Sequence, residues 1–272
     1  MQAVEGVRLV AHGYGARSDP ESMGESINHI TTFLLFRNGT SVRVDMADVG
    51  PIDGQLQLKT KSYHLSDNAA GHVDLVVRGI WTVDDLRQAV PQFGLQTFLF
   101  DDRRFGCRYW QLMLIRMLES RSWLVEHSWA MALNFLVQRY QREPALAAPF
   151  CISPGSFKSR VTQQWALSNL SDMQQRLRSF LTETQTRLVG LRQSYATTVS
   201  QLNEAKRVRD QQGQRRSIEM KVQSLKEEKD RCQRQIDGLE MTINRYNIQL
   251  NQLGRTTGEA WALNNARLHM MQ

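Results

Sequence analysis

The sequence of 272 residues is poor in cysteine and proline and contains no long apolar run. None of its apolar stretches reaches the roughly 18–20 residues that a helix needs to cross a bilayer, so no membrane span is expected. The N-terminal stretch MQAVEGVRLV has no basic segment leading into an apolar one, which argues against a secretory signal. We therefore expect a cytoplasmic protein.

The three cysteines, Cys107, Cys151 and Cys232, show no paired spacing. A sparse and odd set in a chain without a signal indicates reduced thiols rather than a disulfide framework. The sequence also lacks CxxC, HExxH and other metal-ligand spacings. It therefore predicts no metal site and no cofactor.

The prolines and charges divide the chain. Three of the six prolines lie in REPALAAPFCISPGS, residues 142–156, and none follows. Residues 1–150 hold 15 basic and 16 acidic side chains, whereas residues 151–272 hold 19 and 11, so the basic character belongs to the second part. Proline interrupts helices, and we expect a linker here. The predicted domains are a globular domain (1–142), a linker (143–160), a coiled-coil hairpin (161–254) and a tail (255–272).

The first domain has a mixed α and β pattern. The run INHITTFLLF, residues 27–36, leads into Asn38-Gly39, which is a strong signal for a tight hairpin. The next run alternates, with Val42, Val44 and Met46 on one face. Thr82 and Asp85 have the spacing of a capping box at the start of a helix.

Residues 107–119 are apolar around most of a helical circumference, with a narrower polar stripe formed by Arg108, Gln111, Arg116 and Glu119. A helix of this kind is buried. A second helix is expected nearby, within WLVEHSWAMALNFLVQRY. The predicted fold class is therefore α+β, with a small antiparallel sheet packed on a buried central helix.

The second part has heptad spacing. Steps of four and three residues connect Ile218, Val222, Leu225, Lys229, Cys232, Ile236, Leu239, Ile243, Tyr246, Leu250 and Leu253. A weaker series runs through Leu181, Thr184, Leu188, Leu191, Tyr195, Thr198, Leu202 and Ala205. The two series are one residue out of register, which favours an antiparallel coiled-coil hairpin turning near Gly213 over one continuous helix. Such a hairpin indicates self-association or a protein partner. The tail is compatible with a short helix through Trp261 and Leu268.

Cys107 is a candidate nucleophile because it begins the buried helix. The free N–H groups and the dipole of a helix N-terminus favour a thiolate and could hold an oxyanion, and Arg103, Arg104 and Arg108 add positive potential. Among the six histidines, His29 is the best placed base, because it lies in a predicted strand that can face the helix. The alternative is that Cys107 is a packed core residue, as buried free cysteines commonly are.

A strand histidine followed by a hairpin and a helix cysteine resembles the circularly permuted papain-like thiol hydrolases, which include the PPPDE isopeptidases and the lecithin:retinol acyltransferase-like enzymes. The resemblance rests on NHITTFLLFRNGTSVRVDM and RRFGCRYWQLML and covers residues 7–120. The same phrases are similar to an uncharacterised fungal domain family. The resemblance implies a cysteine hydrolase or acyltransferase using Cys107 and His29. Arg43 and Asp45 lie nearest to the third polar residue of the acyltransferases, and Asp45 would orient His29. The Gly-Cys-Arg-Tyr-Trp stretch here departs from the motifs of both enzyme groups.

The sequence also allows a second candidate function and contains a basic segment at the expected turn. The rival function is a non-catalytic interaction protein in which the globular domain binds and the coiled coil associates. The expected hairpin turn is also basic, through Lys206, Arg207, Arg209, Arg215 and Arg216. Such a patch is able to meet phosphates, but no aromatic side chains are interleaved with it, so we expect a solvated turn and no nucleic-acid partner. Cys232 occupies a heptad core position and Cys151 lies in the linker, and both are expected to be inert.

Overall fold

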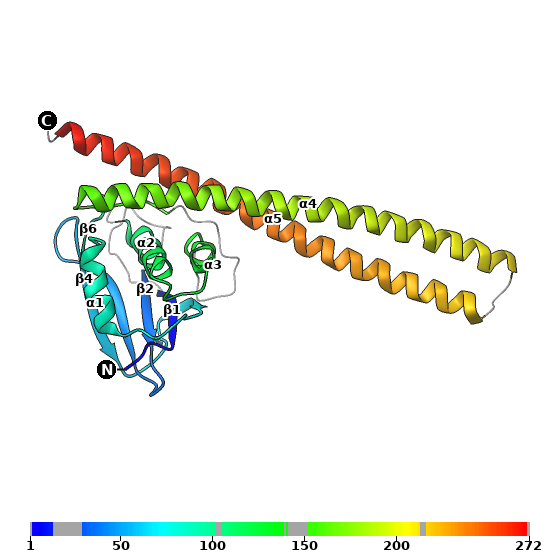
Figure 1. Cartoon of the computed structure of the whole chain (residues 1–272), viewed down its shortest axis with the longest axis horizontal. Helices are drawn as coiled ribbons and strands as arrows, with labels where there is room; N and C mark the ends of the chain where they lie inside the picture. Colours follow the sequence, from blue (N-terminus) through cyan, green and yellow to red (C-terminus); the bar gives the residue numbers. More distant parts are fainter. Residues whose placement is uncertain are drawn as a thin grey trace, which may run out of the picture. The chain divides into compact units, whose positions relative to one another are not determined.

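A computed structural model of the chain describes residues 2–12, 29–101, 105–138, 140, 152–212 and 216–270. The fold is α+β, with an antiparallel sheet and short helices followed by two long helices (Figure 1), so the predicted class is confirmed. The strands are β1 (Gly6–His12), β2 (Ile30–Leu35), β3 (Ser41–Asp48), β4 (Asp53–Lys61), β5 (Ala69–Leu75), β6 (Thr97–Leu99) and β7 (Ser156–Phe157). The helices are α1 (Val83–Gln92), α2 (Cys107–Ser120), α3 (Ser128–Leu136), α4 (Arg160–Gln212) and α5 (Arg216–Met270).

The described strands form one sheet in the order β5-β1-β2-β3-β4-β6-β7, with antiparallel neighbours throughout. The predicted hairpin at Asn38-Gly39 connects β2 to β3. Its turn is closed by the Phe36 N–H, which donates to the Thr40 carbonyl at 3.1 Å. Gly39 has a φ of +82°, a conformation that glycine adopts without strain.

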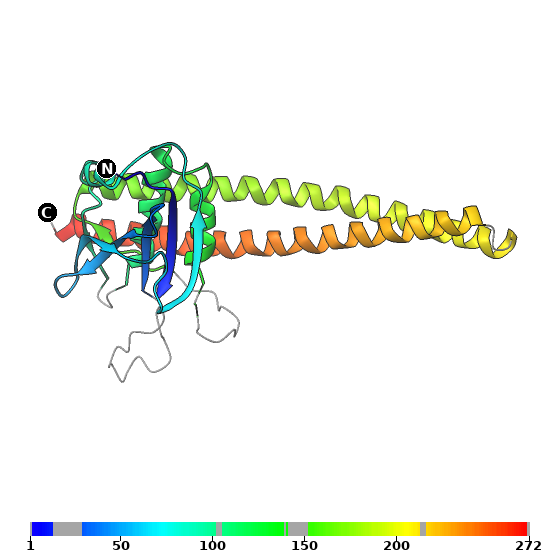
Figure 2. The ribbon, with the colours of Figure 1, turned by 90° about the horizontal axis from the view of Figure 1, so that it is seen from below.

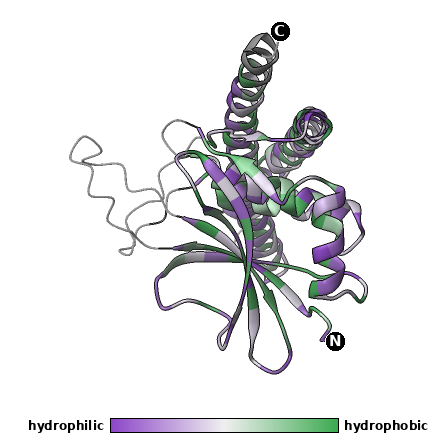
Figure 3. Ribbon diagram, turned by 90° about the vertical axis from the view of Figure 1, so that its left-hand side faces the viewer, coloured by the Kyte–Doolittle hydropathy of each residue, from purple (hydrophilic) through white to green (hydrophobic). Residues whose placement is uncertain are grey.

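Hydrophobic and hydrophilic residues alternate along the strands (Figure 3). On β3, Val42, Val44 and Met46 are buried, as the alternating pattern predicts. Ser41 and Asp45, on the opposite face of the same strand, are also buried. The second face of the sheet is therefore not simply a solvated surface, and it buries a carboxylate that requires polar partners.

Helix α1 begins as its sequence predicts. The Asp85 N–H donates to the Thr82 hydroxyl at 3.3 Å, and the Asp85 carboxylate accepts from the Thr82 N–H at 2.7 Å. This reciprocal capping box satisfies two backbone groups that would otherwise lack a helical partner.

Helix α2 is the predicted buried central helix, and it contacts both β2 and α3. Of its polar stripe, Arg108 and Gln111 are buried, Arg116 and Glu119 are mostly buried, and each has a specific partner. The Arg108 guanidinium donates to the carbonyls of Leu136 and Gln138, just beyond the end of α3. The amide of Gln111 bonds β2. A buried polar group is tolerated when it is hydrogen-bonded in this way.

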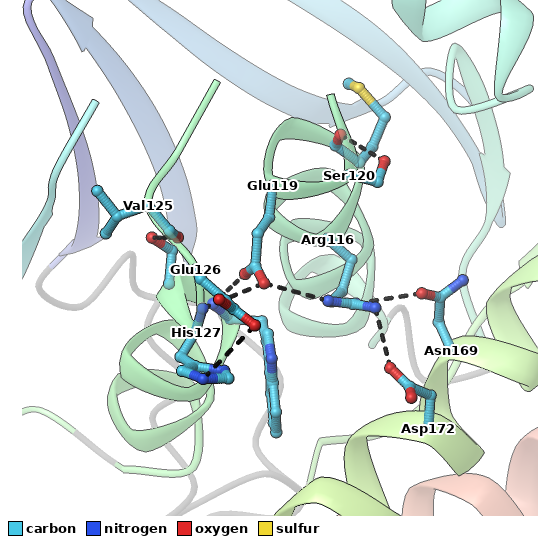
Figure 4. A network of polar contacts seen from close by, with 11 residues as sticks. Arg116, Glu119, Ser120, Val125, Glu126, His127, Asn169 and Asp172 are labelled. Carbon is cyan, nitrogen blue, oxygen red and sulfur yellow. Dashed lines mark hydrogen bonds and ion pairs between the residues drawn. The ribbon is translucent and has the colours of Figure 1, made fainter. Parts of the chain in front are cut away.

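The other end of the stripe forms the polar network in Figure 4. The Glu119 carboxylate accepts from the N–H groups of His127 and Trp129 at 3.2 and 3.0 Å, and it thereby caps the start of α3. Arg116 lies 3.4 Å from Glu119 and 3.1 Å from Asp172 on α4. These two ion pairs and two hydrogen bonds together form a partly buried network that connects α2, α3 and α4.

The described chain separates into two compact units, and their limits differ from the predicted domains. One unit comprises residues 1–173 and 251–272, and the other comprises residues 174–250. The chain just after the prolines belongs to the first unit because β7 pairs with β6 and buries Phe157. The predicted tail belongs there too: α5 continues to Met270, and the Thr256 hydroxyl donates to the Ile152 carbonyl at 2.8 Å.

The second unit is the helical hairpin, in which α4 and α5 run side by side (Figure 1, Figure 2). Leu202, Ala205 and Val222 form its buried cluster near the turn, and Arg192 pairs with Glu240 at 2.6 Å farther along. The partner numbers rise on one helix as they fall on the other, so the helices are antiparallel, and the alternative of one continuous helix is wrong. Gly213 lies outside the described residues.

Most of the buried residues of the hairpin occupy heptad positions. These buried heptad residues are Thr184, Leu188, Thr198, Leu202, Ala205, Val222, Cys232 and Ile236. Within the described part of the chain, no helix combines the length and apolar character needed to cross a membrane.

Candidate active site

Cys107 is the first residue of α2, and the preceding glycine determines how it is presented. Gly106 has a φ of +134°, a backbone conformation that residues with a side chain rarely adopt. A Cβ atom on Gly106 would also lie 2.7 Å from the Phe98 ring. The N-cap residue, Gly106, has no side chain that could cap this helix start. The terminal N–H groups of α2 therefore contribute their positive potential around Cys107.

Gln111, one turn farther along α2, fixes this end of the helix to the sheet. Its Oε1 accepts from the Thr32 hydroxyl at 2.6 Å, and its Nε2 donates to the Ile30 carbonyl at 3.3 Å. Residues four apart share a helix face, so Cys107 is directed to the start of β2. A backbone hydrogen bond from Ile30 to Cys107 is consistent with this placement.

His29 lies directly before β2, and Asp45 lies on the neighbouring strand β3. The distance between His29 Nε2 and Asp45 Oδ1 is 2.8 Å. Because Asp45 engages Nε2, the other ring nitrogen, Nδ1, is the one available to Cys107. The Asp45 side chain is only 7% exposed, whereas the His29 imidazole is 43% exposed. The carboxylate is thus buried behind the histidine, which keeps contact with solvent.

The electrostatics of Cys107 and His29 are coupled. Burial raises the pKa of the Cys107 thiol, but the hydrogen bond and charge of His29, followed by the charge of Arg108, outweigh burial and lower this pKa. Burial also lowers the pKa of His29, but its hydrogen bonds to Asp45 and Cys107 outweigh burial and raise it. Opposite shifts of this kind favour a thiolate beside an imidazolium at neutral pH.

Asp45 is held as a carboxylate by two partners. Burial raises its pKa, but the hydrogen bond and charge of His29, together with Arg43, outweigh burial and lower it. The Arg43 guanidinium donates to Asp45 Oδ2, while His29 occupies Oδ1. The site is therefore a connected series from Cys107 through His29 and Asp45 to Arg43.

A second histidine lies beside the first. The rings of His12 and His29 stack with centroids 6.1 Å apart, and His12 Nε2 lies 2.7 Å from the Thr31 hydroxyl. Burial, then the charges of Arg43 and His29, lower the pKa of His12 to about 4, so its ring is neutral at pH 7. His12 is not among the site residues predicted from the sequence. Its place on β1, the strand next to β2, would have identified it once the strand pairing was known.

The structure brings the three predicted site residues, Cys107, His29 and Asp45, into one constellation. Of the three arginines expected near the thiol, Arg108 is described and lowers the pKa of Cys107, whereas Arg103 and Arg104 lie outside the described residues. Among the described His, Cys, Asp and Glu side chains, no group of three is arranged to hold a metal ion.

The other candidate positions are found elsewhere. Cys232 is buried in the hairpin, where its Sγ lies 3.8 Å from Glu228 Oε1 on the same helix. Cys151 lies outside the described residues. At the basic turn, Arg207 pairs with Glu204 and Arg209 with Asp210, so acidic neighbours partly neutralise these two arginines.

Comparison with known proteins places the chain in a family without assigning an activity. Residues 7–158 match the family described as Domain of unknown function (DUF7770), and the chain belongs to that family. The match covers the sheet, α1 to α3 and β7, and hence the whole constellation around Cys107. No curated protein and no solved structure matches the chain.

Proposed function

We propose that the globular unit is a cysteine-dependent hydrolase or acyltransferase of permuted papain-like type, with Cys107 as nucleophile. The observation that carries this proposal is His29, which interacts with the Cys107 thiol on one side and with Asp45 at 2.8 Å on the other. This is the geometry of a nucleophile, a base and an orienting carboxylate.

The proposed reaction is acyl transfer in two steps. The Cys107 thiolate attacks the carbonyl carbon of an amide or ester and forms a C–S bond, and the N–H groups at the start of α2 stabilise the oxyanion. His29 gives its proton to the departing nitrogen or oxygen as the C–N or C–O bond breaks. Neutral His29 then takes a proton from water or an alcohol, which cleaves the thioester and restores the thiolate.

The hairpin has a separate proposed role in assembly or in recruiting a protein partner. Its outer surface exposes Val189, Met220 and Met241 at 66%, 60% and 66%. Apolar side chains exposed on a coiled coil are suited to contact with another chain. A cytoplasmic, reducing location is part of the proposal because the mechanism requires a free thiolate.

The test of the catalytic proposal is selective chemistry at Cys107. At pH 6 to 7, iodoacetamide should label Cys107 at least about tenfold faster than Cys232, since most ordinary thiols remain protonated at that pH. His29→Ala should remove this advantage, and His72→Ala, which changes an exposed histidine on β5, should not. Peptide mass spectrometry after short exposures measures each rate.

An acyl probe tests the second half of the proposal. Mixing the protein with p-nitrophenyl acetate should give a burst of nitrophenolate and an acetyl group on Cys107, and neither should occur in Cys107→Ser. Equal, slow labelling of the cysteines without acetylation would contradict the proposed enzymatic activity. The chain would then be better explained as a non-catalytic interaction protein that keeps the fold.

A further inference from the structure

Arg43 completes the constellation, and its placement follows from the strand. It lies two residues before Asp45 on β3, so the two side chains share a face of the sheet. The Arg43 guanidinium donates to Asp45 Oδ2, on the carboxylate oxygen that His29 does not use. Among the described residues, Asp45 is the hydrogen-bond partner of Arg43, and Arg43 Nε is buried without one.

The position of Arg43 has an electrostatic cost. In the register of β3 and β4, Arg43 lies directly opposite Lys59, and Asp45 lies opposite Gln57. Like charges directly opposite each other destabilise a strand pair. A cation at this position is therefore not explained by pairing across the sheet, and its favourable interaction is with Asp45 along its own strand.

We propose that Arg43 is a positioning residue, which holds Asp45 ionised and turned toward His29 and so holds His29 against Cys107. This inference rests on the proposed function of Cys107. Arg43 acts through Asp45 and does not touch the reacting thiol. With the guanidinium on one oxygen and the imidazole on the other, the carboxylate has a single favourable orientation.

The charged and titratable groups around Asp45 come from several elements. His12 on β1, His29 before β2 and Arg43 on β3 lie near it, and Lys59 on β4 lies opposite Arg43. Beyond His29 lies Cys107 with the buried Arg108 on α2. Of the groups outside the triad, Arg43 is the one that lowers the pKa of Asp45. Lys59 is exposed and has the opposite strand position, which makes it the matched control.

Removing the charge of Arg43 should change the pH dependence of Cys107. Without Arg43 the pKa of Asp45 rises, so the carboxylate is protonated at a higher pH and no longer fixes the imidazole. The Cys107 thiolate then loses part of its stabilisation by His29, and its own pKa rises. The acid side of the labelling profile should therefore move to higher pH.

The experiment measures the rate of iodoacetamide labelling at Cys107 from pH 4 to 8 in the full chain. Arg43→Met and Arg43→Gln should move the acid midpoint up by roughly one pH unit, the scale of losing one close charge partner. Arg43→Lys should retain most of the wild-type profile, and Lys59→Met should retain all of it. Circular dichroism checks that each variant is folded, and Arg43→Gln, which keeps a hydrogen-bond donor, serves if Arg43→Met unfolds.

The outcomes separate the two proposals. Suppose that wild-type Cys107 is selectively reactive and that neither Arg43→Gln nor Arg43→Met shifts the acid midpoint of labelling. The positioning role of Arg43 is then wrong, while Cys107 remains supported as the nucleophile. An equal shift in Lys59→Met would also overturn it, since the effect would then be one of general surface charge. If wild-type Cys107 reacts no faster than Cys232, the proposed function itself fails.

Discussion

The two units of the molecule bury polar groups in different ways. In the hairpin, the buried hydroxyls of Thr184 and Thr198 donate to carbonyls one turn earlier in their own helix. In the globular unit, buried polar groups find partners on distant segments, as His29 does with Asp45 and Gln111 with β2. The first arrangement repeats a local pattern, whereas the second depends on how strands and helices come together.

The two described cysteines show the consequence of this difference. Cys232 occupies a heptad core position, where it packs as a small apolar side chain. Cys107 begins a helix beside a histidine that is itself bonded to a carboxylate. The same residue type is thus set up for packing in one unit and for chemistry in the other, because the pKa of a thiol follows its surroundings.

The largest effect is expected from a charge placed in the hairpin core. Leu202 is 4% exposed and packs with Ala205 and Val222. Leu202→Asp buries an unpaired carboxylate and should cost about 4 kcal/mol of stability. Hydrogen exchange should increase in peptides around residues 195–230, while labelling of Cys107 stays fast.

Val189→Asp provides the control on the same helix, because Val189 is 66% exposed and a charge there remains hydrated. It should change stability by no more than about 0.5 kcal/mol. If Leu202→Asp instead slowed labelling of Cys107 as strongly as it opened the hairpin, the two units would not respond independently, and the comparison between them would lose its basis.

Features of the fold that depend on local patterns could be predicted from the sequence. The Asn38-Gly39 turn, the capping box of Thr82 and Asp85, the buried helix at 107–119 and the heptads of the hairpin all follow from periodicity or turn chemistry, which the chain displays within a few residues. Pairing of Cys107 with His29 was also predictable, from the order of a strand histidine and a helix cysteine.

Other features required the strand register and the packing of distant segments. His12 is adjacent to His29 because β1 pairs with β2. The proposed positioning role of Arg43 is evident only from its hydrogen bond to Asp45. The limits of the units also escaped prediction, because proline-rich composition does not reveal that Phe157 pairs back into the sheet. Nor does a heptad pattern show where a helix of 55 residues joins a globular core.

The next effect concerns pH and the pair of Cys107 and His29. In the unfolded chain the histidine loses its proton near pH 6.5 and the thiol near pH 8.5, approximately. In the folded chain the pKa of Cys107 is lowered and that of His29 is raised. With the thiolate and imidazolium that the proposed function requires, the pair holds one proton across this whole interval. Folding then takes up no net proton at about pH 7 to 8, and stability from the pair is constant there.

Outside this interval, at lower and at higher pH, the pair should contribute less to the free energy of unfolding. Below about pH 6.5 the unfolded chain binds the extra proton, and above about pH 8.5 the folded chain does, so stability falls on each side. The slope is at most about 1.4 kcal/mol per pH unit. Solvent screening narrows the pH range over which this slope applies, because the His29 imidazole is 43% exposed.

Urea unfolding from pH 5 to 10 measures this, as the difference between wild type and a double variant with Cys107→Ala and His29→Ala. A flat difference would show that the two groups titrate as they do in the unfolded chain and are not coupled. Ultraviolet absorbance of the thiolate at pH 7 then reports whether the proton of the pair resides on His29, as we expect, or on the sulfur.

The smallest effect is expected from an ion pair on the hairpin, and it sharpens the contrast with the globular unit. The side chains of Arg192 and Glu240 are 59% and 47% exposed, whereas those of Arg116 and Glu119 are 11% and 8% exposed. Glu240→Gln should cost no more than about 0.5 kcal/mol, because exposed charges lose in solvation and side-chain entropy most of what they gain by pairing.

Glu119→Gln should cost more, roughly 1–3 kcal/mol, because each carboxylate oxygen accepts from a different N–H group at the start of α3 and the single oxygen of glutamine can replace only one of them. Arg116 would in addition lose the charge of a mostly buried neighbour, while its contacts with Asn169 and the half-exposed Asp172 remain. High salt should remove the effect of Glu240→Gln and leave most of that of Glu119→Gln, since screening acts on exposed pairs. Chemical denaturation of both variants at low and high salt checks this. Equal costs would show that burial does not distinguish the two units electrostatically, and the difference between them would then rest on the surroundings of Cys107 alone.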